Sequence, residues 1–277
     1  QSFPGIQPQN AVDEDRSNVG FYADAGYDLN DDVLIGLAAR FENYSDFGTS
    51  VTWGANGRYK MLDDNFSVRS SLSTGFRAPS LHQTYLSNVQ TLLSAGTISN
   101  QGTYNNESEV VRSLGVGELE QETSTNFMLG VAFKPRPGWY ASVDYYNIAV
   151  DDRIVYSSSI ASSDETTQVY QILADANITS LKFFANAVDT KTTGVDIVVD
   201  IPAVELGPGG LDINVAANIS STEIVGAIAT PAPIAAAGVN LFDRKEQSRI
   251  ETARPSDKIT LGLTYHVGNL SAALNNT

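Results

Sequence analysis

The feature that most constrains the fold of this chain is an alternation of apolar and polar residues with a period of two. Phe66, Val68 and Leu72, for example, alternate with Ser67 and Arg69. Successive side chains of a β-strand point to opposite faces, so this pattern is typical of a strand whose two faces meet different surroundings. About ten segments fit it: 19–27, 33–41, 51–59, 66–76, 123–133, 139–145, 193–201, 211–219, 259–267 and 270–274. The sequence therefore predicts an all-β fold of about ten strands.

The connections between these segments fall into two lengths. Short turns rich in Asp, Asn, Gly or Pro lie at 28–32, 61–64, 134–138 and 267–269, and a somewhat longer one lies at 203–210. Long segments lie at roughly 78–121, 152–190 and 222–256 and carry no sustained strand period. Loops of this length are uncommon in compact domains and are usually functional. Within the second, residues 164–177 predict a short helix.

Composition excludes several classes of protein. The chain has 277 residues, a net charge of −15 and no cysteine. Binding of nucleic acid needs clustered Lys and Arg, so the acidic balance argues against DNA and RNA as partners. A disulfide framework is excluded, and no apolar run approaches the ~20 residues of a membrane-spanning helix. The chain begins with Gln and ends within a predicted strand, so we expect an internal fragment of a longer protein.

Two interpretations of the apolar face compete. In a soluble sandwich it would pack against a core, whereas in a membrane barrel it would contact lipid and the polar face would line the lumen. All charged residues of the alternating segments lie on the polar face, a distribution that is compatible with both interpretations. These residues are Asp24, Arg40, Glu42, Arg58, Lys60, Arg69, Arg77, Glu122, Asp144, Asp196, Asp200, Asp212 and Lys258. The short turns and the long loops, however, gather at opposite ends, as in outer-membrane barrels.

The aromatic residues of the apolar face also favour the membrane interpretation. One group lies beside the short turns: Tyr27, Tyr59, Phe66, Phe133, Trp139 and Tyr265. Phe41 and Phe76 lie at the opposite end. Two such groups are typical of the aromatic girdles that mark the two membrane interfaces. The sequence thus predicts part of an antiparallel, up-and-down transmembrane β-barrel.

This barrel has predicted site residues on its polar face. Lumen-facing candidates for ligand contact are Arg40, Arg58, Arg69, Arg77, Asp144, Asp196 and Asp212. Arg77 reaches the rim beside the long loop 78–121, and Pro79 cannot donate to a strand ladder. We expect Arg77 and Pro79 to anchor this loop. Arg77 either pairs with a nearby carboxylate of the lumen or contacts ligand directly.

Five stretches together carry a family resemblance. They are GFRAPSLHQTY (75–85), LEQETSTNFMLGV (119–131), VDYYNIAVDDRIV (143–155), TTGVDI (192–197) and LFDRKEQSRIETARPSDKITLGLTY (241–265). In order and spacing they resemble the C-terminal barrel region of TonB-dependent outer-membrane receptors. The resemblance covers nearly the whole chain.

The resemblance implies a larger, 22-stranded barrel with a plugged lumen in the bacterial outer membrane. It implies active import of a scarce, large ligand such as an iron-siderophore, energised by TonB through an N-terminal region. Residues 1–277 would then be a partial barrel domain, and the plug domain and the last strands are not part of this sequence. The ligand itself cannot be read from these residues.

Chemistry of other kinds finds little support in the sequence. His82 and His266 are the only histidines, too few for a convincing zinc site, and no cofactor motif is present. We predict no metal site and no enzymatic activity. The doublet Asp151–Asp152, where a strand enters a long loop, could in principle bind calcium but is better explained as a solvated strand end. Two alternatives to the transporter are a passive or substrate-specific porin and a soluble or surface-attached all-β binding protein, such as an adhesin.

Overall fold

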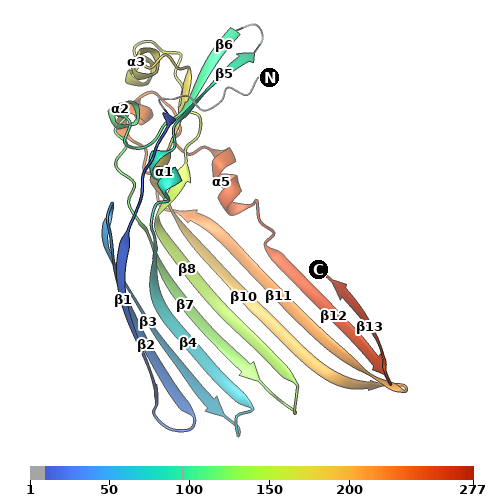
Figure 1. The fold of residues 1–277 in the computed structure, drawn as a ribbon. Coiled ribbons are helices and arrows are strands. Elements are labelled where there is room, and N and C mark those ends of the chain that lie inside the picture. Colours follow the sequence, from blue (N-terminus) through green and yellow to red (C-terminus); the bar gives the residue numbers. More distant parts are fainter. Residues whose placement is uncertain (1–9, 95–96) are drawn as a thin grey trace.

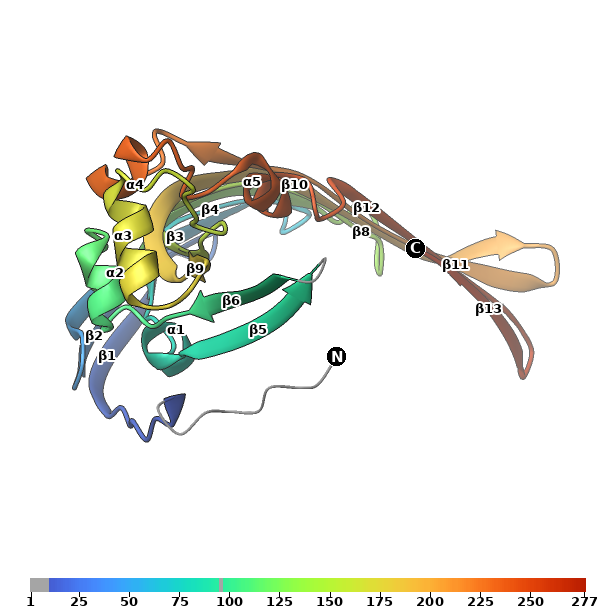
Figure 2. The same cartoon turned by 90° about the horizontal axis from the view of Figure 1, so that it is seen from above.

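A long antiparallel sheet dominates the molecule. The computed structural model describes residues 10–94 and 97–277. Ten strands form one sheet in which neighbours in space are also successive strands of that sheet along the chain (Figure 1). They are β1 (Asn18–Asp28), β2 (Val33–Tyr44), β3 (Gly48–Met61), β4 (Phe66–Arg77), β7 (Glu122–Phe133), β8 (Tyr140–Tyr156), β10 (Phe184–Leu206), β11 (Gly209–Val225), β12 (Asp257–Val267) and β13 (Leu270–Asn276). The ten predicted strands are confirmed, and the curvature seen from above is that of a barrel wall (Figure 2).

The strand register carries the sequence alternation across the sheet. Asp144 on β8 lies opposite Gly130 on β7 and Asp196 on β10. Val143, one residue earlier, lies opposite Val131 and Ile197. Because paired residues share a face, the charged positions fall on one side of the sheet and the apolar positions on the other.

The apolar face is exposed, the reverse of a soluble domain. Phe21, Leu37 and Val51 keep 69%, 60% and 65% of their surface accessible. The other large apolar residues that this face exposes include Val19, Ile35, Phe41, Trp53, Leu72, Phe127, Leu129, Val131, Phe133, Val143, Tyr145, Ile219, Ile259 and Leu261. In a soluble sandwich a second layer would cover this face, so its exposure among the described residues favours the membrane interpretation. A continuous apolar surface of this kind is typical of the lipid-facing side of a membrane barrel.

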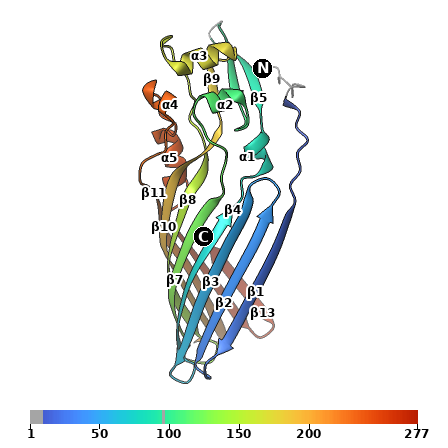
Figure 3. The same ribbon diagram turned by 90° about the vertical axis from the view of Figure 1, so that its left-hand side faces the viewer.

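Turns and loops separate by end, as predicted, with one exception (Figure 3). The tight connections at residues 29–32, 62–65, 134–139, 207–208 and 268–269 all close the same end of the sheet. The exception is the three-residue turn 45–47 between β2 and β3, which lies at the end of the long loops. No helix among the described residues is long and apolar enough to cross a membrane.

The long loops contain regular structure of their own. The first holds α1 (Leu81–Tyr85), β5 (Asn88–Ser94), β6 (Thr97–Thr103) and α2 (Glu109–Ser113). The second holds α3 (Gln168–Asp175) and β9 (Ser180–Lys182), and the third α4 (Ala232–Ala236) and α5 (Arg244–Glu251). Strands β5, β6 and β9 form a small second sheet. Helix α3 confirms the prediction over 164–177. Residues 78–121 form strands β5 and β6 although their sequence carries no sustained strand period.

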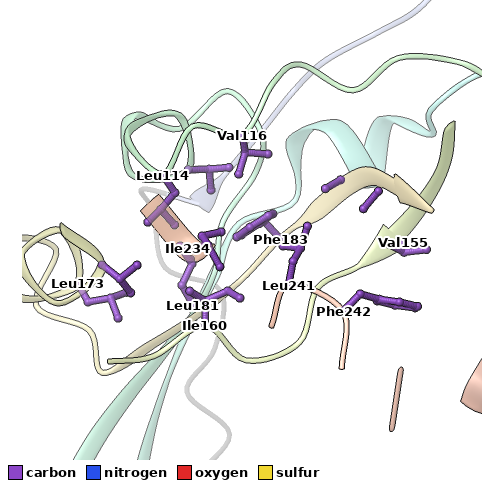
Figure 4. Packing of buried hydrophobic residues seen from close by; sticks show 14 of the residues in the cluster. Leu114, Val116, Val155, Ile160, Leu173, Leu181, Phe183, Ile234, Leu241 and Phe242 are labelled. Carbon is purple, nitrogen blue, oxygen red and sulfur yellow. The ribbon is translucent and has the colours of Figure 1, made fainter. Parts of the chain in front are cut away.

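The hydrophobic core of the molecule lies in these loops. We call residues 78–121, 157–183 and 226–256 the loop cap. Each segment contributes fully or almost fully buried residues to one cluster: Leu114 from the first, Ile160, Leu181 and Phe183 from the second, and Ile234 and Leu241 from the third (Figure 4). The wall exposes its apolar residues, so the loops stabilise themselves by burying apolar surface against one another.

Two strands join the wall to the loop cap. β8 and β10, with 17 and 23 residues, extend beyond their neighbours into the cap. Their register shifts between Asn186 and Thr190, and Asp152 adopts a positive φ of 54° at the same place. Such irregularities bend a β-ribbon and increase its twist. The ribbon therefore changes direction where it leaves the wall.

Candidate functional site

The polar face carries a charge-assisted contact across three strands. Arg69 on β4 donates from Nε to Asp144 Oδ1 on β8 at 2.8 Å and from Nη2 to Oδ2 at 2.6 Å. The pair passes over Gly130 on β7, where an added Cβ would lie 1.9 Å from Asp144 Oδ1. Glycine is therefore required at position 130 for this contact, which ties β4, β7 and β8 together.

The other candidate residues lie on the same face at different heights. Arg40 donates to Glu42 at 2.7 Å, Asp196 accepts from Asn218 Nδ2 at 2.7 Å, and Asp212 accepts from the Ala203 amide at 2.8 Å. Asp212 also lies 3.0 Å from His266 Nε2. Arg58 lies near the short turns, directly opposite Arg69 in the register. The seven residues are thus spread along the wall and do not form one compact site. That this face lines a lumen stays a prediction.

The root of the first loop is held by a buried carboxylate. Arg77 Nε donates to Glu122 Oε2 at 2.8 Å, and Arg77 Nη2 donates to Glu122 Oε1. Glu122 Oε1 also accepts the amide of Ile154 at 2.8 Å, and Glu122 is only 7% exposed. One carboxylate therefore joins β4, β7 and β8 at the base of the loop cap. Of the two roles left open for Arg77, this geometry favours pairing with a carboxylate.

Pro79 is held from a direction that the sequence did not indicate. It is fully buried, and its carbonyl accepts a hydrogen bond from Arg16 Nη1 at 2.6 Å. Arg16 also forms a fork with Asp46, from Nε to Oδ1 at 2.9 Å and from Nη2 to Oδ2 at 2.6 Å. Its guanidinium lies 5.2 Å from the ring centroid of Phe47, within cation–π range.

Sequence reasoning missed Arg16 because it lies just before the first alternating segment. Its partner Asp46 lies in the short turn 45–47, at the end of the sheet where the long loops lie. The comparison of connection lengths along the sequence did not identify this turn. No local signal marks either residue, since the three segments that meet at Arg16 are brought together only by the strand pairing.

The backbone of Asp152, in the acidic doublet at 151–152, is held by hydrogen bonds at the bend of the β8–β10 ribbon. The amide of Asp152 donates to Asp189 Oδ1 at 2.9 Å, and its carbonyl accepts from Asn186 Nδ2 at 2.6 Å. Within residues 10–94 and 97–277 no group of three or more His, Cys, Asp or Glu is arranged to hold a metal ion. Asp152 is explained by the bend of the β8–β10 ribbon, so the suggestion of calcium finds no support.

The ion pair between Arg77 and Glu122 can be tested by mutation. Replacing Arg77 with alanine leaves a buried carboxylate without its cation. Arg77 is 52% exposed, so the expected cost is near the lower end of the range for hydrogen bonds to charged groups, about 1.5 kcal/mol. In the full-length protein we expect ligand binding to weaken about tenfold, measured by titration of purified receptor.

Arg77→Ala should leave insertion of the barrel intact, and Arg244→Ala, which removes an ion pair whose arginine is 74% exposed, should change neither property. Unchanged binding in Arg77→Ala, or failure of that variant to insert, would contradict the anchoring role.

Comparison with known proteins assigns the family. Residues 1–276 match the family model described as TonB dependent receptor-like, beta-barrel. The chain belongs to this family. Its members lie in the outer membrane of Gram-negative bacteria, so the predicted family, barrel fold and localisation are confirmed.

Two curated relatives are receptors for an iron complex. The chain is 29% identical over 134 residues to the ferric enterobactin receptor PirA of Pseudomonas aeruginosa, a match that covers 48% of this chain and 17% of that protein. It is 30% identical over 125 residues to the ferrienterobactin receptor of Escherichia coli, a match that covers 45% of this chain and 16% of that protein.

Solved structures show the same fold at low identity. The siderophore receptor PirA from Pseudomonas aeruginosa superposes with a TM-score of 0.58 and 16% identity, over 94% of this chain and 39% of that one. The RagAB peptide transporter superposes with a TM-score of 0.61 and 13% identity, over 94% of this chain and 33% of that one. The chain therefore spans less than half of each receptor, and the likeness to these structures shows the fold alone.

Proposed function

We propose that this chain is part of an outer-membrane receptor that imports an iron-siderophore. The observation that carries the proposal is the family match over residues 1–276, together with two curated relatives that are both ferric enterobactin receptors. The polar face lines the lumen, the apolar face contacts lipid, and the loop cap lies over the entrance. The chain acts in transport and not as an enzyme.

The proposal assigns the rest of the machinery to the full-length protein. Further strands complete the barrel and a plug domain fills its lumen. TonB supplies energy through the N-terminal region. The passive porin is the weaker alternative, because the matching family is that of TonB-dependent receptors. Peptide import, which the RagAB neighbour suggests, rests on 13% identity and gains no separate support.

The test is uptake of radiolabelled iron by cells. A strain lacking the full-length gene should lose energy-dependent uptake of one or more ferric siderophores and should regain it with the intact gene. The same complemented strain without TonB should show no uptake. Uptake that persists without TonB would favour a porin, and growth and iron uptake that are independent of the gene for every ferric siderophore supplied would refute the proposal.

A further inference from the structure

A hollow lies between the segment before β1 and helix α1. Helix α1 lies on the concave side of the sheet (Figure 2). Its volume is about 550 Å³. One wall is the segment 10–14, and the other runs from Leu81 to Ser87. The lining residues are Asn10, Ala11, Val12, Glu14, Leu81, His82, Tyr85, Leu86 and Ser87. A concave, partly apolar and aromatic surface with a few polar groups is typical of small-molecule sites.

Arg16 connects the two walls of this hollow. It follows the first wall by two residues and binds the carbonyl of Pro79, which precedes the second wall by two residues. Directly after Pro79, Ser80 caps α1: its Oγ accepts the Gln83 amide at 3.2 Å, and its own amide donates to Gln83 Oε1 at 3.0 Å. A continuous chain of hydrogen bonds therefore runs from Arg16 to the helix.

The contacts of Arg16 hold its guanidinium in one position, and this fixes the distance between the two walls. Its side chain is only 15% exposed and that of Asp46 only 20%. The fork on Asp46 and the ring of Phe47 fix the plane of the guanidinium, and this plane directs Nη1 at the carbonyl of Pro79. A lysine retains the charge but has neither the planar fork nor the set of donors that this arrangement uses.

The charges around the hollow are unfavourable for an anion. Glu14 lines it, and no Lys or Arg does. Arg16, which joins the two walls, is already paired with Asp46, and Arg112 of the same loop is paired with Glu107 and Glu118. Burial, followed by the charges of Glu14, Asp46 and Glu107, raises the pKa of the Tyr85 phenol, and the charge of Arg16 opposes this shift. An uncharged ligand avoids their repulsion.

We propose that this hollow contacts an uncharged iron chelate and that Arg16 is a positioning residue that sets the distance between its walls. The inference rests on the proposed function and adds the class of ligand. Three hydroxamate monoanions cancel the charge of Fe³⁺, whereas three catecholate dianions leave a strongly negative complex. A ferric tris-hydroxamate is thus the matching probe and a ferric tris-catecholate the opposing one.

The experiment titrates both chelates into purified full-length receptor. Wild type should bind the ferric tris-hydroxamate more tightly than the ferric tris-catecholate. Arg16→Ala and Arg16→Lys should each weaken binding of the ferric tris-hydroxamate by about tenfold or more. Glu14→Gln should strengthen binding of the ferric tris-catecholate more than it changes binding of the ferric tris-hydroxamate, because only the former carries a negative charge that Glu14 repels.

Hydrogen exchange adds a readout that does not depend on the ligand. The amides of residues 80–87 should exchange faster in both Arg16 variants, while Arg244→Ala, whose ion pair lies on the cap surface, should match wild type. Restoration of binding and protection by lysine would overturn the positioning role, because charge alone would then suffice. Tighter binding of the ferric tris-catecholate by wild type would overturn the ligand class.

The two proposals fail separately. A receptor that supports iron uptake in cells but binds neither chelate contradicts the ligand class and leaves the transport function standing. A receptor that supports no iron uptake contradicts the transport function, and the ligand class falls with it.

Discussion

Replacing Phe183 with alanine will unfold the loop cap and abolish ligand binding while the barrel stays in the membrane. Phe183 is fully buried at the centre of the cluster, and its amide donates to Ser157 Oγ at 3.1 Å. Removal of a buried phenylalanine typically costs 3–5 kcal/mol because it leaves a cavity. Hydrogen exchange should show lost protection at cap residues from all three loops, since they share this core.

The matched control for this prediction is Leu129→Ala on the apolar face of β7. Leu129 is 46% exposed and has no protein core around it, so the substitution should leave the cap and ligand binding unchanged. Loss of protection confined to residues 157–183 in Phe183→Ala would contradict the shared core. It would show that the loops fold independently of one another.

A second large effect is expected from a charge on the apolar face. Leu129→Arg places a cation among lipid tails near mid-height of β7, where arginine costs about 2–4 kcal/mol. Less receptor should reach the outer membrane, and its midpoint of unfolding in urea should fall. Asn126→Arg, on the polar face of the same strand, should insert at nearly wild-type levels. Equal effects of the two substitutions would contradict the assignment of faces.

The wall could be predicted because its environment acts on every second residue. In the proposed barrel, lipid excludes charge from one face while the lumen tolerates it, so each strand carries an alternation that can be recognised in the sequence. The prediction missed the outer ends of β8 and β10. Beyond residue 150 in β8, and before residue 190 in β10, these strands leave the wall and enter the loop cap. In the cap, the polarity of a side chain no longer follows a period of two.

The loop cap could not be predicted because its contacts join distant parts of the chain. Leu114, Phe183 and Ile234 come from three different loops, and none lies in a repeating pattern. The same reason hid Arg16, whose partners Asp46 and Pro79 lie 30 and 63 residues away. Arg77 and Pro79 were accessible to sequence reasoning because a strand with a clear period ends there.

The most direct test of this account compares two adjacent residues of β10. The chain has no cysteine, so Asp196→Cys and Ile197→Cys each introduce a single thiol in this part of the receptor. The two positions lie at the same height on opposite faces of the sheet. In outer membranes containing full-length receptor, a water-soluble, membrane-impermeant maleimide should label the cysteine at 196 and leave the one at 197 unlabelled. Labelling at 197 with protection at 196 would contradict the account.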